Sequence, residues 1–291
     1  MTMTNYITLH KKHFDLKNFV KLALQEDVGD GDHSALATIP ASKKGKVKLL
    51  VKENGIIAGV EAAKQILKII DPKFKFTQFI KDGELVKAGN IAFTIEGSTQ
   101  KLLTAERLVL NVMQRMSAIA TKTNYLQGLC KGTHAKVIDT RKTTPNFRFF
   151  EKWAVVIGGG ANHRFGLYDM IMIKDNHIDF AGGIIEALDA THNYLKKTKR
   201  KLPIEVETRT IKDVQLLLNK GGFQRIMLDN YNIADTKKAV QLINGKFEVE
   251  SSGGITEKTI VSYAKCGVDF ISVGALTHHV KSLDLSLKAV K

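Results

Sequence analysis

Residues 204–254 read IEVETRTIKDVQLLLNKGGFQRIMLDNYNIADTKKAVQLINGKFEVESSGG. Three short apolar runs, Ile204–Glu207, Arg225–Asp229 and Phe247–Ser251, alternate here with segments of helical spacing. The runs end at positions 207, 229 and 251, and this interval of 22 residues accommodates one strand and one returning helix. Strands joined in this way pair in parallel. The stretch therefore predicts a parallel sheet with crossover helices.

The same alternation continues on both sides of this stretch. Apolar runs at Ala135–Asp139 and Met170–Lys174 precede it, and a run at Phe270–Gly274 follows it. Six strand-and-helix units in succession are typical of an α/β barrel or of a doubly wound sheet. The pattern alone does not choose between these two architectures.

Polar and charged residues stand at the end of each predicted strand. The carboxyl ends of parallel strands share one face of an α/β fold, and ligands bind at that face. Loops are polar in general, so one such strand would mean little, but six in succession favour a shared polar pocket. The residues expected at this face are Arg141, Lys142, Lys174, His177, Glu207, Asp229, Ser252, Gly253, Gly254 and Gly274.

A smaller α+β unit precedes these strands. Its expected helices are Leu16–Gln25 and Val60–Ile70, and its expected strands are Gly45–Val51, Phe74–Ile80 and Ile91–Glu96. A long helix over about Thr104–Leu129 follows, because apolar residues recur there at every third or fourth position.

Basic residues outnumber acidic ones, with 44 Lys and Arg against 29 Asp and Glu and a formal net charge of +15. A positive field attracts nucleic acid, membrane headgroups or small polyanionic substrates, and composition does not choose among them. The dense basic run at 196–201 is typical of a solvated helix end. Cys130 and Cys266 stand far apart, which argues against a zinc site or a disulfide framework. No window holds the ~18 apolar residues of a membrane span, so we expect a cytoplasmic protein without a membrane segment.

Cationic residues dominate the predicted pocket. They are Arg141, Lys142, His163, Arg164, Lys174 and His177. Arginine binds a carboxylate or a phosphate through two parallel hydrogen bonds, whereas lysine acts as a compact point charge. So many cations would repel one another unless the ligand carried several negative charges. The set therefore indicates a multiply anionic ligand, such as a dicarboxylate together with a phosphorylated sugar.

Two acidic residues, Glu207 and Asp229, stand among these cations. Carboxylates beside a phosphate site commonly bind Mg2+, an ion that favours one or two carboxylates plus substrate oxygens. Alternatively, each carboxylate forms a salt bridge with a neighbouring Arg or Lys. The sequence favours the metal and leaves the salt bridge open.

Two glycine-rich segments adjoin the strands. Ser252-Gly253-Gly254 follows a strand and precedes a helix expected near Thr256, where backbone N–H groups can bind a phosphate. Gly158-Gly159-Gly160 fits a flexible turn and a ligand-contacting backbone equally well. No Walker loop, dinucleotide fingerprint or nucleophile elbow occurs. Their absence favours catalysis by positioning and electrostatics over a covalent intermediate.

Several longer motifs resemble the signature of quinolinate phosphoribosyltransferases. The central ones are Asp139-Thr140-Arg141-Lys142-Thr143-Thr144-Pro145, the stretch from Gly158 to Leu167, and Ile173-Lys174-Asp175-Asn176-His177. Further matches include Ala105-Glu106-Arg107, Glu205-Val206-Glu207, Met227-Leu228-Asp229-Asn230 and Ser272-Val273-Gly274-Ala275-Leu276-Thr277-His278. The resemblance covers nearly the whole chain in the family's order.

The resemblance implies a fold and an activity. The fold would be an N-terminal α/β sandwich domain at 1–115, joined by a C-terminal helix at about 279–291, and an open α/β barrel catalytic domain at 116–278. The activity would be transfer of phosphoribosyl from phosphoribosyl pyrophosphate to quinolinate with decarboxylation, with Mg2+ as cofactor. The products would be nicotinate mononucleotide, pyrophosphate and CO2.

The resemblance also implies roles for individual residues. Arg107 would reach the partner's pocket in a homodimer, with further assembly left open, and would join Arg141, His163, Arg164 and Lys174 around quinolinate. The residues implied for phosphoribosyl pyrophosphate are Lys142, Glu207, Asp229, Ser252, Gly253, Gly254, Gly274 and His278. Glu207 and Asp229 would also hold Mg2+. The catalytic residues implied are Lys142, Lys174, Glu207 and Asp229.

Two other functions compete with this interpretation. A related phosphoribosyltransferase would use another carboxylated base such as nicotinate, but three arginines and a histidine favour a dicarboxylate. The net charge would suit a nucleic-acid-binding protein, but aromatic residues for stacking make up only 7% of the chain. We therefore expect small anionic substrates and no nucleic-acid partner.

Overall fold

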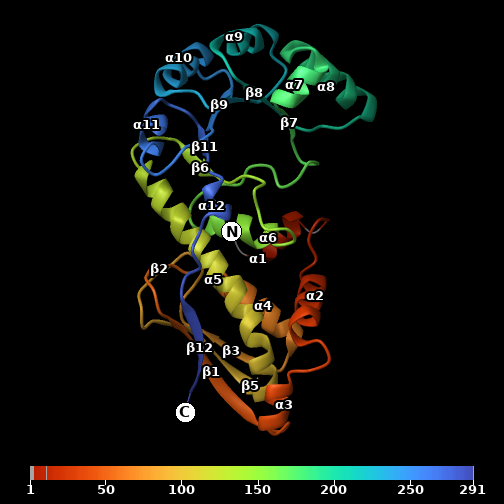
Figure 1. Cartoon of the computed structure of the whole chain (residues 1–291), viewed down its shortest axis with the longest axis vertical. Helices are drawn as coiled ribbons and strands as arrows, with labels where there is room; N and C mark the ends of the chain where they lie inside the picture. The colour runs from red at the N-terminus through yellow and green to blue at the C-terminus, as the bar shows by residue number, and fades with distance from the viewer. Residues whose placement is uncertain (1–2, 11, 291) are drawn as a thin grey trace. The chain divides into compact units, whose positions relative to one another are not determined.

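The computed structural model describes residues 3–10 and 12–290, and the chain divides into two compact units. The first unit consists of residues 1–124, 144–159 and 279–291, and the second of residues 125–143 and 160–278. Figure 1 traces both along the chain. The first unit contains an antiparallel sheet and the second a parallel one.

A four-stranded sheet with the order β12-β1-β5-β3 forms the centre of the first unit. Strand β1 buries the alternate residues Leu49 and Val51, because successive side chains of a strand point to opposite faces of the sheet, whereas β5 buries the four consecutive residues 92–95. The strands are β1 (Lys44–Val51), β3 (Lys75–Gln78), β5 (Ile91–Ser98) and β12 (Leu285–Ala289). A separate sheet pairs β2 (Gly55–Ile56) with β4 (Leu85–Val86).

Helices accompany this sheet along the first unit. They are α1 (Met3–His10), α2 (Leu16–Val28), α3 (His33–Thr38), α4 (Val60–Ile70), α5 (Thr99–Leu129, whose last turns belong to the second unit) and α6 (Arg148–Ile157). Helix α4 begins after Gly59, which has no side chain to cap it. The carboxylate of Asp82 takes that role, accepting hydrogen bonds from the backbone N–H groups of Val60 and Glu61 at 2.8 and 3.1 Å.

The C-terminal segment differs from the expectation of a helix at about 279–291. It forms strand β12, which pairs antiparallel with β1 and places Leu287 opposite Leu49. Apolar and polar residues alternate from Leu283 to Ala289, and Leu283, Leu285 and Leu287 are buried. This period of two specifies a strand with one face against the core, and it outweighs the helical propensity of the leucines.

The second unit contains six parallel strands in the order β6-β11-β10-β9-β8-β7. Each strand that was expected from the sequence is present, and together they form the open α/β barrel. The strands are β6 (Lys136–Ile138), β7 (Ile171–Ile173), β8 (Ile204–Thr208), β9 (Arg225–Asp229), β10 (Glu248–Ser252) and β11 (Phe270–Ser272). The two edge strands β6 and β7 have no pairing with each other among the described residues, so the barrel is open.

Helices follow the barrel strands, as parallel pairing requires. They are α7 (Asp175–Ala181), α8 (Ile184–Thr198), α9 (Ile211–Lys220), α10 (Ile233–Ile243), α11 (Ile260–Lys265) and α12 (Ala275–His278). Within the described residues no helix is both long and apolar enough to cross a membrane.

The long helix begins at Thr99 rather than at about Thr104. The compact units divide after Asn124, within this helix. Residues 144–159, which include α6, belong to the first unit although they lie between two barrel strands in the sequence. Helix α6 buries Phe149, Phe150 and Trp153, and these rings contact Tyr6 and Phe14 of the same unit, with stacking in the Tyr6–Trp153 and Phe14–Phe149 pairs and edge-on contacts in the others.

Candidate active site

A cavity of about 880 Å3 opens at the carboxyl ends of the barrel strands, and all of its lining residues belong to the second unit. It contains nearly every residue that the strand ends were expected to contribute. These are Arg141, Lys142, His163, Arg164, Lys174, Glu207, Asp229, Ser252, Gly253, Gly254, Gly274 and His278. Thr140, Asp175, Asn230, Glu250 and Ser272 also line it.

The register of the parallel strands explains why distant residues meet here. Paired residues on neighbouring strands point to the same face of a sheet. Glu207 on β8 stands beside Met227 on β9, and Asp229 stands beside Ser252 on β10. These polar side chains therefore lie on the same face of the sheet, at the cavity.

Two arginines, Arg141 and Arg164, contribute to the positive charge of the pocket. Burial, followed by the charge of nearby Arg141, lowers the pKa of Arg164 from its usual value. The Nη1 group of Arg164 donates a hydrogen bond to the carbonyl oxygen of Met170 at 3.2 Å, which fixes the direction of the guanidinium. Two cations held close to each other favour a ligand with at least two negative charges.

The backbone around Lys142 is fixed by two threonines. Its N–H donates to Oγ1 of Thr140 at 3.1 Å, and its carbonyl oxygen accepts from Oγ1 of Thr277 at 2.7 Å. Thr277 lies on α12 beside His278, which also lines the cavity. Lys142 and His278 are therefore presented to the cavity from a defined backbone.

Glu207 and Asp229 form the acidic part of the cavity. Burial, followed by the charge of Asp229, raises the pKa of Glu207, so the two carboxylates are close enough to repel each other. The backbone N–H of Asp175 donates to Glu207 at 3.4 Å, and the side-chain amide of Asn230 donates to Asp229 at 2.6 Å. These hard oxygen donors suit Mg2+, because a divalent cation would relieve their repulsion.

The turn after β10 brings bare backbone to the cavity. Gly253 and Gly254 have φ values of +93° and +57°, which glycine adopts without strain. A Cβ on Gly253 would lie 2.8 Å from the backbone nitrogen of Asn230. The expected helix near Thr256 begins later, at Ile260 in α11. The site is therefore a glycine turn at a strand end and does not lie directly at a helix N-terminus.

One sequence expectation is not met at this cavity. His177 is exposed on α7, and its Nδ1 accepts the backbone N–H of Lys174 at 2.9 Å, so it caps the helix and does not line the cavity. Arg107 is exposed on α5 in the first unit and does not line the cavity of its own chain; its expected place in a partner's cavity stays a prediction. A Cβ on Gly158 would lie 2.9 Å from Cα of Ala120, so this glycine is required for packing.

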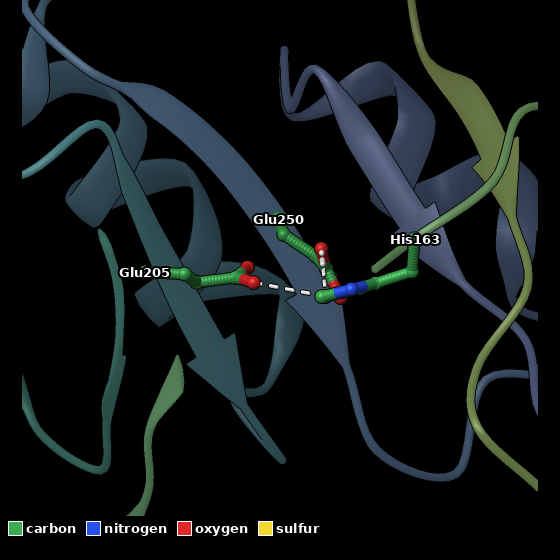
Figure 2. Close-up of side chains that lie close together, drawn as sticks. All are labelled: His163, Glu205 and Glu250. Atoms are coloured by element: carbon green, nitrogen blue, oxygen red, sulfur yellow. Dashed lines mark ion pairs between the residues drawn. The ribbon is translucent and has the colours of Figure 1, made fainter. Parts of the chain in front are cut away.

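The sequence singled out His163 but not its two buried partners, Glu205 and Glu250. His163, Glu205 and Glu250 are 6%, 0% and 0% exposed, and Figure 2 shows both carboxyl groups approaching the same end of the imidazole. Burial, followed by the charge of Glu205, raises the pKa of Glu250 to about 8. A glutamate in the middle of an apolar strand, flanked by Ile204 and Val206 or by Val249, is the signal that could have identified them.

Comparison with known proteins relates the whole chain to one family. Residues 32–117 match the family model described as "Quinolinate phosphoribosyl transferase, N-terminal domain", and residues 119–288 match that of the C-terminal domain. A nicotinate-nucleotide pyrophosphorylase (carboxylating, chloroplastic) from Oryza sativa subsp. japonica is 47% identical, over 94% of this chain and 78% of the rice protein.

Two further relatives agree with these matches. Quinolinate phosphoribosyltransferase (decarboxylating) 1b from Nicotiana tabacum is 45% identical, over 94% of this chain and 82% of its own length. The crystal structure of NadC from Streptococcus pyogenes superposes with a TM-score of 0.87 at 37% identity, covering 95% of this chain and 97% of that one.

Proposed function

This chain belongs to the quinolinate phosphoribosyltransferase family, and we propose that the barrel cavity is where it joins quinolinate to phosphoribosyl pyrophosphate. The reaction releases pyrophosphate and CO2 and gives nicotinate mononucleotide, a step of NAD biosynthesis. We place the reaction in this cavity because of the residues that line it. Arg141, Arg164 and Lys174 line it together with Glu207 and Asp229.

The two arginines and Lys174 suit the carboxylates of quinolinate. Arginine can bind a carboxylate through two parallel hydrogen bonds, and lysine adds a point charge. Burial of Arg164 strengthens its interaction with an anion, because the surrounding protein screens charge less than water does. A dicarboxylate would also relieve the repulsion between Arg141 and Arg164.

A second group of cavity residues suits the phosphorylated sugar. The backbone N–H groups of the Ser252-Gly253-Gly254 turn can donate to phosphate oxygens, as such concave turns do elsewhere. Lys142, Gly274 and His278 lie around the same cavity, and a Cβ on Gly274 would approach both of their side chains, at 3.1 Å for Lys142 and 3.0 Å for His278. The missing side chain of Gly274 therefore leaves room for the ligand.

Glu207 and Asp229 are the residues that we propose to hold Mg2+, directly or through water. When bound, the ion would neutralise charge on the pyrophosphate and on the two carboxylates. Burial, followed by the charge of Asp229, raises the pKa of Glu207, and a cation between the two carboxylates would offset both effects.

The residues of the chain act by binding and orientation. The sugar–pyrophosphate bond breaks at the anomeric carbon while the pyridine nitrogen of quinolinate bonds to that carbon, and Lys142 stabilises the departing pyrophosphate. The resulting pyridinium accepts the electron pair of the bond to the adjacent carboxylate. CO2 leaves, and the ring carbon takes up a proton. Arg141, Arg164 and Lys174 keep the ring aligned through both steps.

We further propose a homodimer in which Arg107 completes the partner's cavity. Arg107 is exposed on α5, beside exposed Leu103, and does not line the cavity of the second unit. An exposed apolar residue next to an exposed arginine suits a protein interface. The compartment that we propose is the cytoplasm, although the rice relative is described as chloroplastic.

A panel of bases tests the proposed reaction. The purified chain is incubated with phosphoribosyl pyrophosphate, Mg2+ and either carboxyl-labelled quinolinate or nicotinate, and labelled CO2 and pyrophosphate are measured. We expect CO2 and pyrophosphate in equal amounts from quinolinate and no turnover of nicotinate, which lacks the second carboxylate. Preferential turnover of nicotinate would overturn the proposal in favour of a related phosphoribosyltransferase.

A further inference from the structure

Arg164 lies on a segment, residues 162–170, that forms neither helix nor strand. The segment follows the single-residue bridge between Ala161 and Ile138, and it ends where β7 begins at Ile171. Backbone N–H groups outside helices and sheets need other acceptors, and side chains commonly provide them. The direction of Arg164 therefore depends on the contacts that hold this loop.

The carboxylate of Asp169 provides two of these acceptors. Its Oδ2 accepts the backbone N–H of Phe165 at 2.5 Å, and its Oδ1 accepts the backbone N–H of Gly166 at 2.8 Å. Both residues are buried, and a buried N–H group without an acceptor is costly. Asp169 thus ties the chain directly after Arg164 to the chain directly before Met170.

The side chain of Arg164 closes the same loop at its other end. Its Nη1 donates to the carbonyl oxygen of Met170 at 3.2 Å, and Met170 follows Asp169 in the sequence. The backbone after Arg164 and the guanidinium of Arg164 are therefore both bonded to residues 169–170. A shift of Asp169 would move both ends of the arginine.

Apolar burial does little to hold the tip of this loop. Leu167 is 69% exposed and Tyr168 is 38% exposed. The ring of Tyr168 lies over Gly166, where a Cβ would come within 2.8 Å of the ring atom Cδ1. A loop with few buried side chains at its tip has low local stability unless hydrogen bonds hold it. The two hydrogen bonds to Asp169 supply that restraint.

Asp169 also places a negative charge near the guanidinium. Burial, followed by the charge of Arg141, lowers the pKa of Arg164, and the charges of Glu205 and Asp169 act in the opposite direction. Each oxygen of Asp169 already accepts a backbone N–H group. The carboxylate thus offsets part of the repulsion between the two arginines and leaves the guanidinium to bind a carboxylate of the ligand.

We propose that Asp169 is a positioning residue for quinolinate, which acts through Arg164 and does not contact the substrate. This inference rests on the proposed function, because it assigns Arg164 to a carboxylate of quinolinate. Asp169 is not among the described residues that line the cavity. A carboxylate in contact with quinolinate would repel it, whereas a carboxylate bonded to the loop backbone directs the arginine toward it.

Asp169→Ala removes the acceptor of both N–H groups together with the charge near Arg164. We expect the Kd for quinolinate, measured by isothermal titration, and the KM for quinolinate to rise roughly 10- to 100-fold, as loss of hydrogen bonds to a charged group predicts. The KM for phosphoribosyl pyrophosphate should stay within about twofold of wild type, because two threonines hold the Lys142 backbone independently. Equal rises in both KM values would indicate a general loss of structure and overturn the proposal.

A double-mutant cycle separates action through Arg164 from an independent effect. The kcat/KM for quinolinate is measured for Asp169→Ala, Arg164→Ala and the double variant. We expect the double variant to lie within about twofold of Arg164→Ala, because no guanidinium remains for Asp169 to position. A further loss as large as that of Asp169→Ala alone would overturn the proposal. If Asp169→Ala does not fold, Asp169→Asn, which keeps an acceptor oxygen for one of the two N–H groups, takes its place in the cycle.

Asp213→Ala is the matched control. Oδ2 of Asp213 accepts the backbone N–H groups of Arg209 and Thr210 at 3.1 and 2.9 Å, so this substitution also removes the acceptor of two successive N–H groups in the second unit. We expect it to lower thermal stability and to leave the Kd for quinolinate unchanged. A rise in Kd equal to that of Asp169→Ala would contradict a role specific to the Arg164 loop.

The same measurements distinguish the positioning role from the proposed function. If wild-type chain bound quinolinate but released no CO2 from it, the proposed function would fail, and the Kd values would still decide the role of Asp169. If wild type released CO2 while Asp169→Ala bound quinolinate as tightly as wild type, only the positioning role would fall. A wild-type chain that neither bound nor consumed quinolinate would overturn both.

Discussion

The buried carboxylate of Glu151 accepts hydrogen bonds from both Nε and Nη2 of Arg115, at 3.0 and 2.9 Å. Its two oxygens also accept from the hydroxyl and the backbone N–H of Thr144, at 2.9 and 3.0 Å. This one carboxylate thus joins helix α5, helix α6 and the chain that leads into α6. It is 0% exposed, so its charge depends entirely on these donors.

Removal of Glu151 should therefore destabilise the chain strongly. Glu151→Ala removes the carboxylate that Arg115 binds, and breaking a buried pair in this way costs about 3–5 kcal/mol of unfolding free energy. Urea unfolding measures the loss. Glu96→Ala is the matched control, because its ion pair with Lys46 is similarly short, at 2.7 Å, but exposed, and we expect little change there. Equal effects of the two substitutions would contradict the prediction.

The two cavity arginines should control the use of quinolinate. We expect Arg141→Ala and Arg164→Ala each to lower kcat/KM for quinolinate roughly 30-fold to several thousand-fold, since truncating one partner of a buried charge pair costs ~2–5 kcal/mol. Arg164→Lys should recover little, because an ammonium cannot make two parallel bonds. Steady-state kinetics with Arg200→Ala, an exposed arginine of the same unit, provides the control. Wild-type kinetics in either cavity variant would show that the quinolinate site lies elsewhere.

The barrel and most of its site could be predicted because their signals are local. A short apolar run that ends in a charged residue, as at Arg225–Asp229, specifies both a buried parallel strand and the polar residue at its carboxyl end. The register then needs no further information to bring Glu207 and Asp229 together. The alternation from Leu283 to Ala289 was equally visible, and the wrong expectation of a helix there came from the resemblance.

Contacts between side chains that are far apart in the sequence could not be predicted. Nothing near His163 in the sequence indicates that its ring faces Glu205 and Glu250, since these residues lie 42 and 87 positions away. His177 was misplaced for the opposite reason. It stands next to a strand end, but the helix that begins at Asp175 turns it back toward the Lys174 backbone and away from the cavity.

Gly253 should be irreplaceable for the binding of phosphoribosyl pyrophosphate. A Cβ there would meet the side chain of Asn230 and lie 2.8 Å from its backbone nitrogen, at a φ of +93°. Gly253→Ala should therefore displace the turn and raise the KM for phosphoribosyl pyrophosphate more than that for quinolinate. Gly245→Ala is the control, since Gly245 also has a positive φ, +71°, but nothing lies within 4 Å of its Cβ position. Its strain of ~1–2 kcal/mol should appear in thermal stability alone.

The shared cavity predicts complementation between two inactive chains. Arg107→Ala removes the residue that we propose to enter the partner's cavity, and Lys142→Ala disables the cavity of its own chain. A mixed dimer would contain one intact cavity, made of Lys142 from one chain and Arg107 from the other. We expect mixing, after mild dissociation, to restore up to about a quarter of wild-type activity, as random pairing of two equal populations gives. No recovery in dimers shown to be mixed would argue for cavities built from a single chain.

Ionisation of Glu250 should lower the free energy of unfolding as the pH rises. Burial, followed by the charge of Glu205, raises the pKa of Glu250 from 4.5 to about 8, so the folded chain holds a proton that the unfolded chain has released. The associated stabilisation is complete below 4.5 and is lost as the pH rises through about 8. Burial raises the pKa of Glu205 as well, which acts in the same direction.

Glu250→Gln isolates this contribution, because glutamine keeps a donor for Glu205 and an acceptor for Arg225 but does not titrate. Urea unfolding of both chains is measured at about pH 5 and about pH 8. The contributions of the titratable groups that the two chains share cancel in the difference between them. We expect wild type to lose more unfolding free energy than the variant over this interval. Parallel losses in the two chains would mean that Glu250 stays ionised in the folded barrel, with Arg225 and His163 sufficient to hold its charge.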